Sequence, residues 1–202
     1  MSRIPVRPGR GIFGAAERFL RHPSTTTGNV AWPSVRIDRA RPGDGVGILQ
    51  AHRSSFQSTY AEVPGMDVSA LSEFVRHDLT PRKILEWSRK ADAGSDGLYV
   101  ARSNNRIIGF AEISPDSSGM ELSGLYVMFS RMGYGNGNRL LSTVLNDIPP
   151  VAPVSLHVAK NTSAVEFYRR HDFVIVGEAE TPPPLQRARV HLPQWIMRRE
   201  GT

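Results

Sequence analysis

The stretch from Glu121 to Leu145, ELSGLYVMFSRMGYGNGNRLLSTVL, contains the change of hydrophobic period that decides the fold. Its first seven residues mix leucine, tyrosine and valine in a run too short for a confident helix, which predicts a strand. Further on, apolar residues recur at helical spacing and predict a helix. The residues of this predicted apolar stripe are Leu140, Leu141, Val144, Leu145 and Ile148.

Three alternate glycines, Gly133, Gly135 and Gly137, separate the predicted strand from the predicted helix. Because glycine has no Cβ, an anionic group can approach its backbone, and the N–H groups at a helix N-terminus lie unpaired at the positive end of the helix dipole. The turn therefore predicts a phosphate-binding loop, with a tight turn that binds nothing as the alternative. A P-loop is excluded, since Asn138 and Arg139 follow where it needs Lys and Ser or Thr, and a dinucleotide fingerprint needs a different glycine spacing.

Two motifs together resemble the GCN5-related N-acetyltransferase (GNAT) family. Leu125-Tyr126-Val127, the three glycines and Leu140-Leu141 resemble its acetyl-CoA motif, and residues 156–173, LHVAKNTSAVEFYRRHDF, resemble its second motif. The resemblance implies an α/β fold with a mixed sheet of six to seven strands, about four flanking helices and splayed central strands. It also implies an N-acetyltransferase that uses acetyl-CoA as co-substrate, without a metal.

The same resemblance implies which residues bind acetyl-CoA. Three positions depart from the family pattern: Met132 replaces a usual Gln or Arg but follows Arg131, Asn136 replaces an aliphatic residue, and Asp172 replaces a glycine. None of these changes removes a backbone donor, so we expect the ligand class to be unchanged. The implied cofactor-binding residues are Leu125, Tyr126, Val127, Met132, Gly133, Tyr134, Gly135, Asn136, Gly137, Asn138, Asn161 and Tyr168.

Acetyl transfer from a thioester to an amine needs a neutral amine, a donor for the oxyanion and a proton for the leaving thiolate. The resemblance implies that a strand N–H near Val127 is the oxyanion donor and that the Tyr168 phenol is the proton donor. For Tyr168 the alternative is a tyrosine that only packs on the sheet.

Glu121 is the candidate base. Strand alternation predicts that it shares a face with Ser123, Leu125 and Val127, whereas the alternative is a solvated strand start. Glu112 on the preceding strand, or a water molecule, remains an alternative base.

Two further polar residues lie near the second motif. His157 is expected to face away from its apolar neighbours and to serve in packing. Asn161 is expected to cap the following helix and contact the cofactor, and Ser163-x-x-Glu166 predicts a capping box.

Composition limits the remaining classes of protein. The 202 residues, 40% of them apolar, allow one α/β domain with an extension. No apolar run is long enough to span a membrane. The absence of cysteine excludes disulfides, thiol nucleophiles and cysteine zinc sites, and favours a cytoplasmic location.

The net charge of +6 is concentrated at the N-terminus. Residues 1–41 contain eight Arg against two acidic residues, and the rest of the chain is neutral. We therefore expect a flexible basic extension over residues 1–33 and the acetyltransferase domain over 34–202. Two alternatives are a mitochondrial presequence and an anionic partner, such as nucleic acid bound by the basic tail.

The acceptor is expected between residues 60–67 and residues 181–192, as the resemblance implies. Acidic residues near these segments favour a cationic amine, without distinguishing small amines from protein amines. A module that binds acetyl-CoA without turnover is an alternative, and a homodimer is left open. The acidic residues are Glu62, Asp67, Glu178 and Glu180.

Overall fold

The computed structural model describes residues 34–61, 63–78, 80–93 and 97–202. The predictions made for the N-terminal extension, and for Glu62, lie outside these residues. Within the described part of the chain, no helix combines the length and the apolar character needed to cross a membrane.

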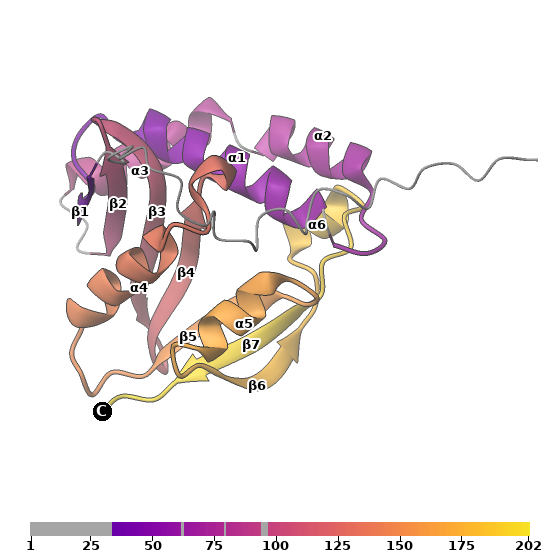
Figure 1. Ribbon diagram of the computed structural model, residues 1–202. Coiled ribbons are helices and arrows are strands. Elements are labelled where there is room, and N and C mark those ends of the chain that lie inside the picture. Colours follow the sequence, from indigo (N-terminus) through magenta and orange to yellow (C-terminus); the bar gives the residue numbers. More distant parts are fainter. Residues whose placement is uncertain (1–33, 62, 79, 94–96) are drawn as a thin grey trace, which may run out of the picture. The chain divides into compact units, whose positions relative to one another are not determined.

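Seven strands, six α-helices and one short 3-10 helix make up the described residues (Figure 1). In chain order they are β1 (Val35–Arg39), α1 (Gly45–Ala61), α2 (Val68–Asp78), α3 (Pro81–Asp92), β2 (Leu98–Ser103), β3 (Arg106–Asp116), β4 (Gly119–Val127), η2 (Phe129–Arg131), α4 (Asn136–Asn146), β5 (Val154–Ala159), α5 (Ser163–Arg169), β6 (Val174–Ala179), α6 (Pro183–Arg187) and β7 (Gln194–Arg199).

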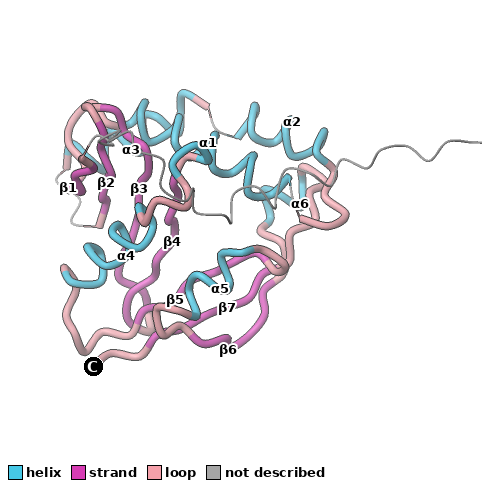
Figure 2. Tube along the Cα trace, viewed as in Figure 1, coloured by secondary structure: helices cyan, strands magenta, loops and turns pink. Residues whose placement is uncertain are grey.

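All seven strands belong to one mixed sheet, in the order β1-β2-β3-β4-β5-β7-β6 (Figure 2). Neighbouring strands are antiparallel except β4 and β5, which are parallel. Because a parallel pair needs a crossover connection, α4 carries the chain from β4 to β5. This arrangement confirms the predicted α/β class and the mixed sheet.

Apolar residues on the two faces of the sheet form two separate core clusters. One cluster joins α1, α2 and α3 to one face through residues such as Ile48, Leu71 and Phe110. The other joins α4 and α5 to the opposite face through residues such as Leu141 and Leu156. The sheet therefore has helices on both faces, as in other α/β folds.

A hairpin turn joins β2 to β3. Asn104 and Asn105 lie in this turn and both adopt the positive φ that it requires, 48° and 61°. The described residues form six α-helices, against the about four that the family resemblance implies. α2 and α3 are separate helices that divide before Pro81, and α6 has five residues.

Candidate functional site

A gap opens between β4 and β5 at the centre of the sheet. Their parallel pairing covers only Met120 with Val154 and Glu121 with Ser155, and the two strands then diverge (Figure 1). The rest of β4 stays paired with β3 on its other edge. The splayed central strands expected from the family resemblance are therefore present.

Backbone N–H groups of β4 point into this gap. Met128 N–H donates to the Ile108 carbonyl over 2.8 Å, on the β3 side. Since successive N–H groups along a strand point to opposite edges, the N–H of Val127 points to the edge that β5 has left, as does that of Leu125. Two candidate donors thus face the space between the strands.

The glycine-rich turn lies between the end of β4 and the start of α4. Gly133 and Gly135 have φ of 79° and 75°, and a Cβ built on either one would meet no atom within 4 Å. Gly137 differs, because its Cβ would touch the Phe167 ring of α5 at 3.5 Å. The first two glycines thus leave open space over the backbone, whereas a Cβ at the third would make an ordinary van der Waals contact with α5.

The geometry of this open turn is suited to binding a phosphate group. The α4 helix starts at Asn136, earlier than the predicted apolar stripe, so the N–H groups of Asn136, Gly137 and Asn138 belong to its first turn and have no partner within the helix. Donors at the N-terminus of an eleven-residue helix beside an open backbone suit a pyrophosphate.

Polar side chains fix the shape of the turn. Asn136 is buried and its Nδ2 donates to the Arg131 carbonyl over 2.9 Å, which closes the loop on itself. Asn138 Oδ1 lies 3.2 Å from His171 Nε2 at the end of α5. Met132 and Tyr134 are exposed. Ile148, which was predicted to belong to the helical stripe, lies beyond the end of α4 at Asn146 but still packs against the core.

Three tyrosines interact where the gap joins the two faces of the sheet. Tyr60 and Tyr126 share a side-chain hydrogen bond, and Tyr168 interacts electrostatically with both. Tyr168 belongs to the α5 core cluster, whereas Tyr126 and Tyr60 pack on the α1 side. Residues from opposite faces of the sheet therefore meet at this point.

Burial shifts the ionisation of all three phenols in the same direction. It raises the pKa of Tyr60 to about 12, against a small opposing effect of the hydrogen bond from Tyr126. Burial, reinforced by Tyr60, raises the pKa of Tyr168 well above its ordinary value, and the pKa of Tyr126 is raised well above its ordinary value, first by burial. Each phenol is thus protonated at neutral pH and can donate a proton.

The predicted face of Glu121 is wrong. The pairing of β3 with β4 shifts from Glu112–Gly124 to Ile113–Leu122, so Ser123 is an extra residue that interrupts the alternation. Leu122 and Leu125 both pack in the α4 cluster, and Glu121 consequently faces the opposite side, that of Tyr126.

Glu112 lies on this same face but has a partner. Its carboxylate forms an ion pair with Lys90 of α3. In the strand register, Glu121 lies opposite Ser114 of β3 and opposite Ser155 of β5. The pair with Ser155 is the last between β4 and β5 before the gap. The two candidate bases therefore lie on one face, and Glu121 lies where the gap begins.

The start of α5 differs from the prediction. The helix is capped by Thr162, without a side-chain capping bond, and Thr162 Oγ1 donates to the Ala159 carbonyl over 2.9 Å instead. Ser163 is already the first helical residue, so the predicted capping box does not form. Asn161 is not the cap either, because it adopts φ of 60° in the preceding turn.

The neighbouring positions agree with the sequence analysis only in part. Asp172, which stands where the family has glycine, adopts φ of 65°, a conformation that favours glycine. His157 faces away from Leu156 and Val158, as expected, but it is exposed, so the expected role in packing is wrong.

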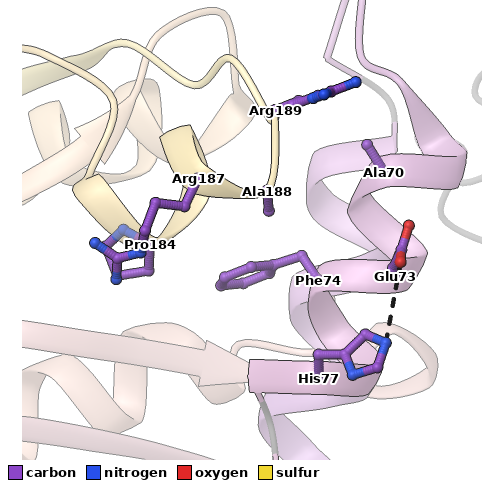
Figure 3. A pocket seen from close by; sticks show the side chains of 8 residues that line it. All are labelled: Ala70, Glu73, Phe74, His77, Pro184, Arg187, Ala188 and Arg189. Carbon is purple, nitrogen blue, oxygen red and sulfur yellow. Dashed lines mark ion pairs between the residues drawn. The ribbon is translucent and has the colours of Figure 1, made fainter.

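A pocket of about 480 Å³ lies between α2 and the segment that contains α6 (Figure 3). In Figure 3 the ring of Phe74 points from α2 toward α6, and Glu73 Oε1 lies 4.0 Å from His77 Nε2 along α2, an ion pair when the histidine is protonated. One wall belongs to the segment 181–192 that was expected to border the acceptor, whereas the other wall is formed by α2 and includes no residue of 60–67. Its lining residues are Ala70, Glu73, Phe74, His77, Pro184, Arg187, Ala188 and Arg189.

Two of the four acidic residues expected to attract a cationic amine have other partners. Asp67 Oδ1 accepts the N–H groups of Ser69 and Ala70 over 2.9 and 3.0 Å at the start of α2. Glu178 pairs with Lys160 at 2.6 Å. Neither Asp67 nor Glu178 lines the pocket.

The sequence analysis missed Tyr60 and the two pocket arginines as site residues. Tyr60 follows His52 and Phe56 at intervals of four, so helical spacing could have placed all three on one face. No comparable signal marks Arg187 and Arg189, because a loop has no periodicity. Among the described residues, no group of three or more His, Asp or Glu side chains could hold a metal ion.

Comparisons with known proteins agree with this geometry. Residues 62–181 match a family described as an acetyltransferase (GNAT) domain. A protein of Mycobacterium tuberculosis, named a probable N-acetyltransferase, is 30% identical over 160 residues that cover 78% of this chain and 90% of that protein.

Solved structures show the same fold at lower identity. The PaiA N-acetyltransferase of Thermoplasma acidophilum, solved with coenzyme A, is 19% identical with a TM-score of 0.64, over 83% of this chain and 99% of that chain. A GNAT acetyltransferase of Streptococcus pneumoniae is 20% identical with a TM-score of 0.60, over 84% of this chain and all of that one (100%). With its splayed strands, its glycine turn and these matches, the chain belongs to the GNAT family of acetyltransferases.

Proposed function

We propose that this protein transfers an acetyl group from acetyl-CoA to a primary amine, with Tyr168 as acid and Glu121 as base. The observation that carries the proposal is the gap between β4 and β5, into which β4 donors point. The open glycine turn lies at the β4 end of the same region.

The residues that would hold acetyl-CoA follow from these positions. The backbone of Gly133 to Asn138 would bind the pyrophosphate, since its donors lie beside open space. The N–H groups of Leu125 and Val127 would pair with the pantetheine and the thioester oxygen in the gap, each with about 0.5 to 1.5 kcal/mol net. When bound, the co-substrate supplies an acyl thioester that an amine can attack.

Tyr168 is proposed to protonate the leaving sulfur. Its phenol is buried beside the gap, and its pKa is raised by burial and by Tyr60, so it keeps its proton throughout the neutral range. A group that stays protonated can serve as an acid but not as a base at neutral pH.

Glu121 is proposed to remove a proton from the acceptor's ammonium group, directly or through water, so that the neutral amine can attack the thioester. It lies where β4 and β5 separate, on the face that carries Tyr126. Glu112 lies on the same face but is neutralised by Lys90, which makes it the weaker candidate.

An acetyl-transfer screen tests the proposal. The protein would be incubated with acetyl-CoA and mixed amines and peptides, and free thiol release would be followed together with the mass of the products. We expect thiol release that depends on at least one amine. If acetyl-CoA binds but no amine is acetylated, the protein would be a non-catalytic acetyl-CoA-binding module and the proposal would be wrong.

A further inference from the structure

His171, just after α5, contacts the first turn of α4. Its Nε2 lies 3.2 Å from Oδ1 of Asn138, the third residue of α4. Both helices pack on the same face of the sheet (Figure 1), and Asn138 directly follows Gly137 of the glycine-rich turn. A side chain from the end of α5 thus reaches the turn that is proposed to bind the pyrophosphate.

Neighbouring groups restrict where the imidazole of His171 can lie. Its ring packs against the Phe167 ring with 5.0 Å between the centroids, and its backbone N–H donates to the Tyr168 carbonyl over 2.9 Å. The Phe167 ring in turn lies 3.5 Å from the position of a Cβ built on Gly137. The imidazole is therefore packed between the end of α5 and the start of α4.

The surroundings of His171 favour its neutral form. Burial lowers the pKa of His171, and the nearby Arg170 has the same effect. Asp172 opposes this shift and Arg199 adds to it. A neutral imidazole carries its single proton on Nδ1 or on Nε2, and the hydrogen-bond partner decides which. Because Nε2 faces an amide oxygen, which can only accept, Nε2 carries the proton and donates to Asn138.

The amide of Asn138 has one acceptor group and one donor group. Its oxygen faces His171, and among the described residues none accepts a hydrogen bond from its NH2 group. Side chains on a helix lean toward the N-terminus of that helix, so the exposed Asn138 leans toward the open turn of Gly133 and Gly135. A phosphate group bound there would meet a side-chain donor beside the backbone donors.

We propose that His171 is a positioning residue for the co-substrate: it holds the Asn138 oxygen, so that the Asn138 NH2 group donates to the pyrophosphate of acetyl-CoA. An amide turned the other way would present its oxygen to the phosphate and repel it. This inference rests on the proposed function only in so far as acetyl-CoA binds at the glycine turn, and it does not require acetyl transfer.

The test measures the affinity of the full-length protein for coenzyme A by calorimetry. We expect His171→Ala to lower the affinity by about 3- to 10-fold, because Asn138 loses the partner that orients it. His171→Gln should restore most of the affinity, since the glutamine Nε2 can also donate to Asn138. The Tm without ligand should change little in either variant, because His171 is only partly buried.

Asn138→Ala separates positioning from direct contact with the ligand. It should lower the affinity at least as much as His171→Ala does, and the double variant should lose no more than Asn138→Ala alone, because His171 acts through Asn138. The matched control is His77→Ala. It removes an exposed histidine of α2, a helix that packs on the opposite face of the sheet, and it should keep the wild-type affinity.

Two results would overturn the role of His171. One is wild-type affinity in His171→Ala, and the other is a double variant whose loss is the product of the two single losses. Gly135→Val, which fills the open space of the turn, separates this failure from failure of the site. If Gly135→Val abolishes binding while His171→Ala binds normally, the role of His171 is wrong and the pyrophosphate site stands. If both variants bind normally, the site is wrong and the role of His171 is wrong with it.

Discussion

Gly135 offers a test of the phosphate-binding turn at a single residue. Its φ of 75° means that any side chain strains the backbone, and its Cβ would project into the open space over the loop. We expect Gly135→Val to abolish the rise in Tm that acetyl-CoA causes in the wild-type protein, because a ligand that binds only the folded state stabilises it by mass action. Thermal unfolding with and without acetyl-CoA measures this.

Gly43 provides the matched control for Gly135. It also has positive φ, 88°, and open space around a built Cβ, but it lies in the turn before α1. Gly43→Val should lose a similar amount of stability and keep the full ligand-induced shift. If the Gly135 variant folds and keeps its shift as well, the turn does not bind the phosphate.

Substitutions of Tyr168 and of Glu121 should lower kcat/KM with different pH dependences. Tyr168→Phe should lower kcat/KM by about 10²- to 10⁴-fold, by a constant factor from about pH 6 to pH 9, because the raised pKa keeps this phenol protonated over that range. Glu121→Gln should lower it by a similar factor at low pH, and the loss should shrink as pH rises and more of the amine is already neutral.

The measurement is kcat/KM against pH for both variants on an acceptor found by the screen. Acetyl-CoA affinity serves as the control and should change little in either variant. Wild-type activity of Tyr168→Phe over the whole range would leave this residue a packing tyrosine.

The residues of the site were predictable where a motif fixes them. The glycines of the turn follow from spacing, and the structure leaves open space beside Gly133 and Gly135. The face of Glu121 was not predictable, because one extra residue at Ser123 inverts the alternation, and a bulge is determined by pairing with another strand. Arg187 and Arg189 line a pocket with residues of α2 only because the tertiary fold brings the two segments together.

Arg102 joins three elements of the fold. Its guanidinium on β2 forms an ion pair with Asp44, which precedes α1, and lies 3.8 Å from Asp38 of β1. Asp44 is 8% exposed. We expect Arg102→Ala to lower the free energy of unfolding by about 3 to 5 kcal/mol, because it leaves a buried carboxylate without its charged partner. Chemical denaturation measures the loss.

Arg36 provides the control at the same edge of the sheet. It pairs with Asp38 at 2.8 Å, but its side chain is 62% exposed, so Arg36→Ala should cost less than about 1 kcal/mol. Similar losses in the two variants would show that the Arg102 pair has no special role in stability.

At the level of elements, strands were predicted more closely than helix ends. β5 is a regular strand, because the apolar residues Val154, Leu156 and Val158 alternate there without interruption. The start of α5 was misplaced because Asn161, Thr162 and Ser163 are all good capping residues, and the choice among them depends on the turn after β5. α6 has five residues, too few for a periodic pattern.

For the whole molecule, we propose that residues 34–202 form the acetyltransferase domain on their own. A chain that begins at Trp32 should fold with the Tm of the full-length protein and bind acetyl-CoA equally well, because both core clusters lie within the described residues. Circular dichroism and calorimetry measure the two properties. A large loss of Tm on truncation would contradict the proposed boundary.

The two residue pairs that join β4 to β5 also have a consequence for local unfolding. They link two larger hydrogen-bonded ladders, β1 to β4 and β5-β7-β6, and we expect the two ladders to open with different free energies. Hydrogen–deuterium exchange of the free protein should divide the strand amides into two groups with different opening free energies. Pantetheine bound in the gap would bridge the ladders, so acetyl-CoA should slow the less stable group most and bring the two groups together. A co-substrate that serves as the missing part of the sheet would thus make the protein unfold as one cooperative unit.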